Sequence, residues 1–263
     1  MRTPVRVTVL ASLVALAVAL VGCAGRKDKG EPPAELTEFQ PTITIDKVWS
    51  TKVGGKSERL RLGLRPASDG ARIFAGAYDG QVASFDAASG DKVWSVQTDL
   101  PLTAGPGFGD GLLTFGTADG DLLALDAATG QERWRQAIGS EILAAPAIGN
   151  GVIVVRTVDG RLRGFSAANG TVVWNVEQNL PTLTLRGNPA PRVSGPLVVS
   201  GFNNGRVAAY ELANGDAAWE VAIANPTGRS ELERLVDVSS GICLLYTSPS
   251  PRDTERSRMP SSA

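Results

Sequence analysis

Residues 118–134 have the sequence ADGDLLALDAATGQERW, which contains two turn signals and one tryptophan. The Asp-Gly pair at 119–120 supplies the positive backbone dihedral angles that a tight hairpin turn requires. Short alternating segments flank this turn, at 112–117 and 121–126, and a second glycine-containing turn precedes a segment that ends in Trp134. The stretch therefore predicts consecutive antiparallel strands joined by tight turns.

The same arrangement recurs along the chain. Residues 78–94, YDGQVASFDAASGDKVW, repeat it before Trp94, and later copies place Asp159-Gly160 and Asn204-Gly205 at the first turn and Asn169-Gly170 and Asn214-Gly215 at the second. The tryptophans are spaced 45, 40, 40 and 45 residues apart, at Trp49, Trp94, Trp134, Trp174 and Trp219. A fixed period of this length is typical of repeat architectures in which each copy is one small structural unit.

Each repeat holds about four strands, because a further strand, such as 151–156, precedes each Asp-Gly or Asn-Gly turn. Four strands leave no room for crossover helices, which excludes parallel α/β folds and helical solenoids. A single four-stranded sheet cannot bury both faces, so successive sheets must stack, and radial closure leaves few open edges. We expect an all-β fold, a β-propeller of four-stranded antiparallel blades.

The repeated tryptophans and aspartates each allow two interpretations. A tryptophan in every repeat favours a packing anchor between blades, whose indole N–H can find a carbonyl; an aromatic platform for a ligand is the alternative. The aspartates favour turn formation over metal binding or acid–base chemistry. Recurrence in every repeat indicates structure rather than a single site, and we expect no metal and no cofactor.

The composition narrows the functional classes. The chain has 263 residues, of which 43% are hydrophobic and 20% charged, values typical of a globular protein. Its 26 basic and 27 acidic residues give a net charge of −1, so nucleic acid is not an expected partner. It contains no histidine, which excludes His-dependent hydrolytic triads and His-ligated zinc.

The N-terminus has the layout of a secretory signal. Arg2 and Arg6 precede an apolar run, 7–21, which is short for a membrane span, and the run ends in the sequence LVGC at 20–23. This ending resembles a bacterial lipobox, so we expect residues 1–22 to be removed and Cys23 to carry lipid; a plain signal peptide with an incidental cysteine is the alternative. Acyl chains on Cys23 would anchor the protein stably in a membrane. Residues 23–42 are polar and proline-containing, as expected for a linker.

The repeat around 122–134 resembles that of the pyrroloquinoline-quinone-type propellers, a family that includes dehydrogenases, kinase sensor domains and a lipoprotein of the outer-membrane β-barrel assembly machinery. Two non-repetitive regions, 183–191 with 201–207 and then 227–238, are similar to characteristic segments of the assembly lipoproteins. With the lipobox, this resemblance covers residues 1 to about 238.

The resemblance implies a non-enzymatic scaffold, lipid-anchored in the outer membrane and facing the periplasm. Its partners would be BamA, the barrel subunit, with the rest of the BAM complex, and nascent outer-membrane proteins. It also implies that the two regions lie near each other on one face, and by position it assigns BamA contacts to Leu183, Leu185, Arg186 and Asp237. The alternative is that the two leucines form an inward strand face and that Arg186 pairs internally with Asp237. The two interpretations are compatible if an internal ion pair shapes the loop.

The last residues depart from the family pattern. After Val238 the periodicity ends, and residues 243–253 resemble translated sequencing-adapter sequence, so we expect 43–238 to be a partial propeller and 239–263 to be a non-native tail. The assembly lipoproteins have eight blades, and about four and a half repeats are present, so we expect a fragment of a longer protein. Two other functions stay open: a fragment of a quinone-dependent dehydrogenase, which needs an oxygen-rich Ca²⁺ site, or of an envelope sensor.

Overall fold

The computed structural model describes residues 43, 45–55, 63–185, 189–239 and 241–243. The chain divides into two compact units, 1–46 and 47–263. In the first unit, the described residues 43, 45 and 46 belong to no strand or helix. All the regular structure that is described lies in the second unit and consists of strands. Within the described residues, no helix has the length and apolar character needed to cross a membrane.

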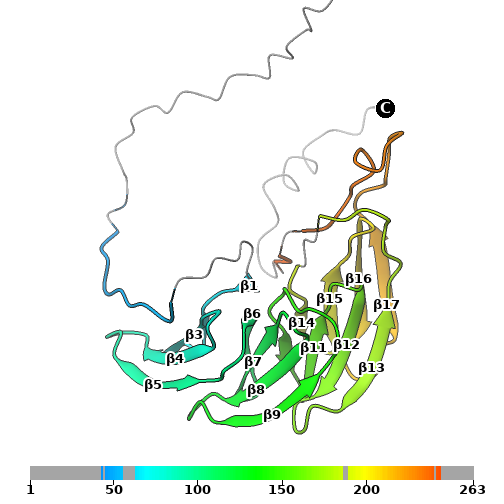
Figure 1. Ribbon diagram of the computed structural model, residues 1–263. Helices are drawn as coiled ribbons and strands as arrows, with labels where there is room; N and C mark the ends of the chain where they lie inside the picture. The colour runs from blue at the N-terminus through cyan, green and yellow to red at the C-terminus, as the bar shows by residue number, and fades with distance from the viewer. Residues whose placement is uncertain (1–42, 44, 56–62, 186–188, 240, 244–263) are drawn as a thin grey trace, which may run out of the picture. The chain divides into compact units, whose positions relative to one another are not determined.

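The strands form four antiparallel sheets, which are the blades (Figure 1). Blade one contains β2 (Ala67–Ser68), β3 (Arg72–Gly76), β4 (Gln81–Asp86) and β5 (Lys92–Gln97). Blade two contains β6 (Leu102–Gly109), β7 (Leu112–Thr117), β8 (Asp121–Asp126) and β9 (Glu132–Ala137), with β1 (Gly63–Leu64) added in parallel to β6. Blade three contains β10 (Ala147–Gly149), β11 (Val152–Arg156), β12 (Arg161–Ser166) and β13 (Val172–Glu177). Blade four contains β14 (Arg192–Ser194), β15 (Leu197–Gly201), β16 (Arg206–Glu211) and β17 (Ala217–Ala222).

These sheets confirm the all-β propeller fold expected from the repeats. The innermost strands β2, β6, β10 and β14 contact one another in chain order, so the blades stand side by side about an axis. Three apolar clusters lie between successive blades; Phe115, Phe165 and Phe202 are among their most buried members. The core is therefore a series of interfaces between blades rather than one central cluster.

The recurring tryptophans join each blade to the next. The indole nitrogen of Trp94 donates a hydrogen bond to the carbonyl oxygen of Ala127 (3.3 Å), and that of Trp134 donates to Ala167 (2.9 Å). Equivalent bonds run from Trp49 to Ala87 and from Trp174 to Leu212. Each ring also lies against a glycine of the next blade's second turn, at Gly90, Gly130, Gly170 and Gly215. The packing-anchor interpretation of the tryptophans is confirmed for these four.

The repeated aspartates form turns, as expected. Oδ1 of Asp86 accepts hydrogen bonds from the backbone nitrogens of Ala88 and Ser89, both at 2.9 Å. Asp126 caps its own turn in the same way, through the residues two and three positions later. These carboxylates satisfy backbone donors that a tight turn leaves unpaired.

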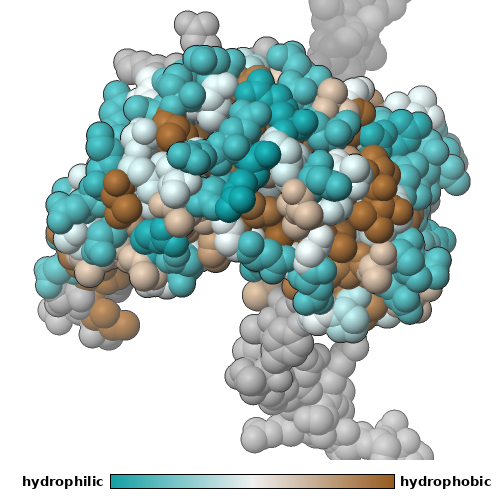
Figure 2. All heavy atoms as spheres, turned by 90° about the horizontal axis from the view of Figure 1, so that it is seen from below, coloured by the Kyte–Doolittle hydropathy of each residue, from teal (hydrophilic) through white to brown (hydrophobic). Residues whose placement is uncertain are grey.

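The outer strands of the last two blades expose more apolar surface than the inner ones. In Figure 2, apolar groups lie among polar side chains, and the larger groups are on the side of blades three and four. Exposed large hydrophobic residues on β13 and β17 are Val172, Val173, Trp219 and Val221. Trp219 is 45% exposed, unlike the equivalent Trp174, because no further blade covers it within the described residues.

Candidate functional site

Three segments that are distant in sequence meet beside blade four. The backbone nitrogen of Leu185 donates a 2.6 Å hydrogen bond to Oδ2 of Asp237, and the side-chain amide of Asn203 donates to the same oxygen at 3.0 Å. The backbone nitrogen of Val238 donates to the carbonyl oxygen of Phe202 at 3.1 Å. Where they are described, the two regions singled out by resemblance, 183–191 and 227–238, are therefore in direct contact, as expected.

The two leucines point their side chains outward. Leu183 is 42% exposed and Leu185 is 50% exposed, and both lie in a loop that follows β13. The alternative in which they form an inward strand face is wrong, because residues 178–185 form no strand. The backbone of Leu185 is thus held by Asp237 while half of the residue's surface is exposed.

Of the remaining expected site residues, Asp237 lies within the described part of the chain, and Arg186 and Cys23 do not. Asp237 is partly buried and is bound within the chain through its Oδ2 atom. Arg186 lies outside the described residues, so its pairing with Asp237 stays a prediction. Cys23, the expected lipidation site, also lies outside them.

A buried arginine, which the sequence analysis did not single out, lies next to Asp237. Arg156 ends β11 and is 1% exposed; its Nη2 donates to Oδ1 of Asn203, and its guanidinium lies 5.3 Å from the centre of the Phe202 ring. Burial lowers the pKa of Arg156 to about 10, and the negative charge of Asp237 opposes that effect. The group therefore keeps its charge at neutral pH. One sequence signal could have found it: the other three blades have glycine at the equivalent place, at Gly76, Gly116 and Gly201.

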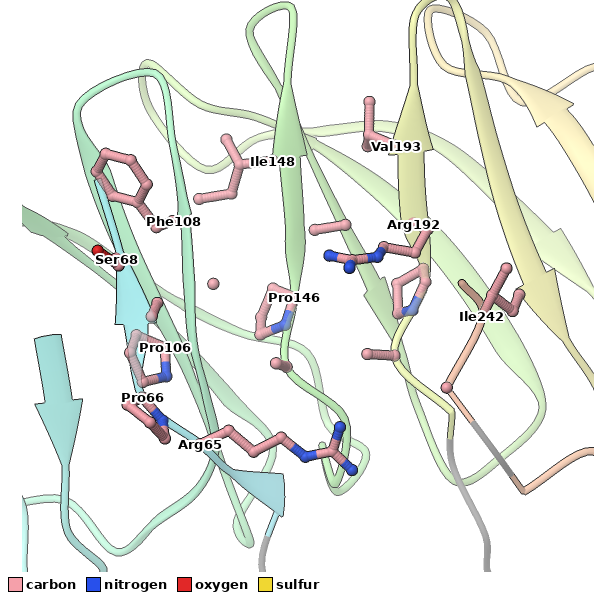
Figure 3. Close-up of a pocket in the computed structure, with 17 residues that line it drawn as sticks. Arg65, Pro66, Ser68, Pro106, Phe108, Pro146, Ile148, Arg192, Val193 and Ile242 are labelled. Carbon is pink, nitrogen blue, oxygen red and sulfur yellow. The ribbon is translucent and has the colours of Figure 1, made fainter. Parts of the chain in front are cut away.

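A cavity of about 510 Å³ lies between the innermost strands (Figure 3). Pro66, Pro106 and Pro146 line it, and the side chains of Arg65 and Arg192 approach it from opposite sides. Its described lining contains no acidic residue, so its charged groups are cationic. Within the described part of the chain, no group of three or more His, Cys, Asp or Glu residues is placed to bind a metal ion.

Four antiparallel blades in chain order, joined by tryptophan contacts, define a β-propeller of the pyrroloquinoline-quinone-repeat class. The family model described as "Outer membrane protein assembly factor BamB" matches residues 44–103 and 78–244. The chain belongs to this BamB family. Its repeats and its non-repetitive segments are thus accounted for by one family.

Individual relatives agree with this assignment. The BamB of Pseudomonas aeruginosa is 49% identical over 234 residues, which cover 89% of this chain and 62% of the relative. The BamB of Xanthomonas campestris is 36% identical over 124 residues, or 40% of this chain and 30% of the relative. The crystal structure of BamB from Moraxella catarrhalis superposes with a TM-score of 0.66 at 26% identity, covering 73% of this chain and 59% of that one. The chain thus spans about three fifths of the P. aeruginosa relative.

A designed protein gives separate support for the fold. The crystal structure of the computationally designed Ika8 protein superposes with a TM-score of 0.51 at 19% identity, and the match covers 66% of this chain. At that identity the likeness concerns the arrangement of strands alone.

Proposed function

We propose that this chain is a non-enzymatic scaffold for the assembly of outer-membrane proteins and docks on BamA through Leu183 and Leu185. Membership of the BamB family supports a role in outer-membrane protein assembly. The geometry of the loop supports Leu183 and Leu185 as the docking surface. One observation carries the proposal: the backbone of Leu185 is fixed by Asp237 while half of its side chain is exposed. A loop whose backbone is already held loses less conformational entropy when a partner binds than a loop that must first be ordered.

The chemistry of the loop fits a protein partner. Two leucines two residues apart in sequence offer apolar contact area, and removing apolar surface from water is favourable by about 25 cal/mol per Å². Arg186, next in sequence, would add a planar donor group that can bind a carboxylate or backbone carbonyls. Arginine is among the residues that are enriched at interface hot spots.

The location of the scaffold follows from the same proposal. Lipid on Cys23 would hold the chain on the periplasmic side of the outer membrane, and residues 24–42 would link the anchor to the blades. In that position residues 178–185, which we call the docking loop, can meet the periplasmic part of a membrane-embedded partner. The BAM complex is then the assembly in which the chain acts.

Nascent outer-membrane proteins are the proposed substrates, bound by strand addition at the outer edge of a blade. The edge strand β13 carries the exposed Val172 and Val173, whereas β9 carries exposed charges that oppose pairing. An unfolded barrel polypeptide should therefore protect the backbone amides of β13 from hydrogen exchange and leave those of β9 unprotected. Equal protection of both strands, or of neither, would contradict this mode of binding.

Binding of purified BamA to substituted chains tests the docking surface. Leu183→Asp and Leu185→Asp place a charge where apolar contact is proposed, and each should weaken the Kd by at least about tenfold, or ~1.4 kcal/mol. Val93→Asp is the matched control, because Val93 is 52% exposed on blade one. It should change the Kd by less than about twofold. Leucine variants that keep the circular dichroism spectrum and bind BamA like the unsubstituted chain would overturn the proposal.

A further inference from the structure

Arg156 interrupts a rule that the other blades follow. In each blade the end of the second strand pairs with the start of the third, and Arg156 pairs with Leu162. The equivalent pairs in blades one, two and four are Gly76 with Val82, Gly116 with Leu122, and Gly201 with Val207. Blade three therefore has the largest cationic side chain where the repeat has none.

The glycines at this place have a packing reason. A Cβ atom added to Gly76 would lie 2.5 Å from the Phe115 ring, and one added to Gly116 would lie 2.4 Å from Ile142. At Gly201 it would lie 2.4 Å from Val238. An apolar side chain from further along the chain thus fills the space beside each glycine. The propeller can be built with glycine here, so the fold does not itself require an arginine.

The polar groups around Arg156 lead in one direction, toward the docking loop. Asn203 joins Arg156 to Asp237, because its Oδ1 accepts from Arg156 while its amide nitrogen donates to Asp237. Asp237 in turn accepts from the backbone nitrogen of Leu185. Four residues from two blades and two loops are thus connected by three consecutive hydrogen bonds.

The positive charge of Arg156 and the negative charge of Asp237 stabilise each other. Within the described residues, Nε and Nη1 of Arg156 and Oδ1 of Asp237 are buried without hydrogen-bond partners. A buried charge is costly unless an opposite charge lies near it, and removing one member leaves the other uncompensated. Removing the charge of Arg156 should therefore disfavour the present position of the partly buried Asp237 carboxylate.

We propose that Arg156 is a positioning residue for the docking loop: through Asn203 and Asp237 it holds the backbone at Leu185. The inference rests on the proposed function in so far as Leu183 and Leu185 contact BamA. It adds a residue that itself contacts no partner and that lies on a different blade from the loop it positions. Its partner-facing effect is indirect, through the place and rigidity of the two leucines.

Hydrogen exchange at the Leu185 amide tests the inference in the full chain. Arg156→Met removes the charge and keeps most of the volume, and it should speed exchange at Leu185 by at least about tenfold. The amide of Leu123 in β8 is the internal control and should be unaffected. Arg156→Lys keeps the charge and should stay within about threefold of the unsubstituted chain.

A double variant separates positioning from simple packing. Asp237→Asn removes the uncompensated carboxylate but keeps an oxygen that can accept from Leu185, so Arg156→Met with Asp237→Asn should exchange more slowly at Leu185 than Arg156→Met alone. Loss of packing volume at 156 would not be corrected by a change at 237. Folding of the double variant when Arg156→Met alone does not fold would support the inference for the same reason.

The outcomes for this inference and for the docking proposal are distinct. Unchanged exchange at Leu185 in Arg156→Met, or faster exchange that Asp237→Asn does not slow, overturns the positioning role, as does failure of both variants to fold. Faster exchange with weaker BamA binding supports both proposals. Faster exchange with unchanged BamA binding in Arg156→Met and in Leu185→Asp supports positioning and overturns the docking surface.

Discussion

The indole nitrogen of Trp174 and the carbonyl oxygen of Leu212 are 2.8 Å apart across the boundary between blades three and four. The ring of Trp174 also covers Gly215, so one side chain contacts both ends of the turn between β16 and β17 of the next blade. Trp219 occupies the same place in blade four, and within the described residues no hydrogen bond from its indole nitrogen is present. The repeat thus contains the same residue in a bonded and in an exposed setting.

This contrast predicts different costs for the same substitution. Trp174→Phe removes a buried hydrogen bond and leaves the Leu212 carbonyl unpaired, so the free energy of unfolding should fall by about 1–3 kcal/mol. Trp219→Phe should change it by less than about 0.5 kcal/mol. Urea denaturation followed by fluorescence and circular dichroism measures both. Equal losses in the two variants would contradict the anchor role.

A second prediction concerns the glycine beneath each anchor. Gly170 and Gly111 share a φ of +73°, but a Cβ on Gly170 would meet the Trp134 ring at 2.6 Å, whereas nothing lies within 4 Å at Gly111. Both alanine variants bear the strain of a left-handed backbone, about 1–2 kcal/mol. Gly170→Ala should lose at least about 1 kcal/mol more than Gly111→Ala, because it also displaces the ring. Thermal unfolding of the two variants checks the difference.

The turn at Asp126 should make stability depend on pH. Hydrogen bonds from Arg133, then from Thr129 and Ala128, lower the pKa of Asp126 to about 2, against the opposing effect of burial. Its pKa in the unfolded chain is about 3.9, so the stabilisation is complete above that pH and is lost as the pH falls toward 2. Asp126→Asn should therefore differ most from the unsubstituted chain above pH ~4 and least near pH ~2. If the free energies of unfolding of the two chains differed by the same amount at every pH in this range, the stabilisation would not depend on the ionised Asp126 carboxylate.

The lipidation of Cys23 can be tested independently of the structure of the blades. Cys23→Ser should abolish incorporation of radiolabelled palmitate and release the chain from the membrane fraction, because the thiol is the proposed site of acylation. Cys243→Ser, at the exposed free cysteine, is the matched control and should leave both measurements unchanged. Labelling that persists in Cys23→Ser would place the lipid elsewhere or show that the signal is of another kind.

Much of the fold could be predicted from the sequence because local signals and the repeat agree. The expected strands 112–117 and 121–126 coincide with β7 and β8, since their turns are specified by neighbouring Asp and Gly residues. The carbonyl that each tryptophan reaches could not be predicted, because that contact depends on the angle between blades. Trp219 shows the limit: its sequence environment matches the other repeats, yet its burial depends on what lies beside it.

The candidate site was predictable only in part. The resemblance brought the regions around Leu185 and Asp237 together, and their hydrogen bond confirms that proximity. The outward direction of the leucines was open until the loop was seen, because alternating residues can face either way. Arg156 was missed because a lone arginine at the end of a strand usually reaches solvent; alignment of the four repeats on their turns isolates it.

Each tryptophan bond runs forward along the chain, and donor and acceptor are separated by only 33 to 38 residues. For a β-protein these closures are short, and short closures favour fast folding. If the chain is secreted, as its N-terminal sequence predicts, blades one to three can each bond to the next blade as soon as that blade has left the translocation pore. The order of secretion would then also be the order in which these described blades assemble.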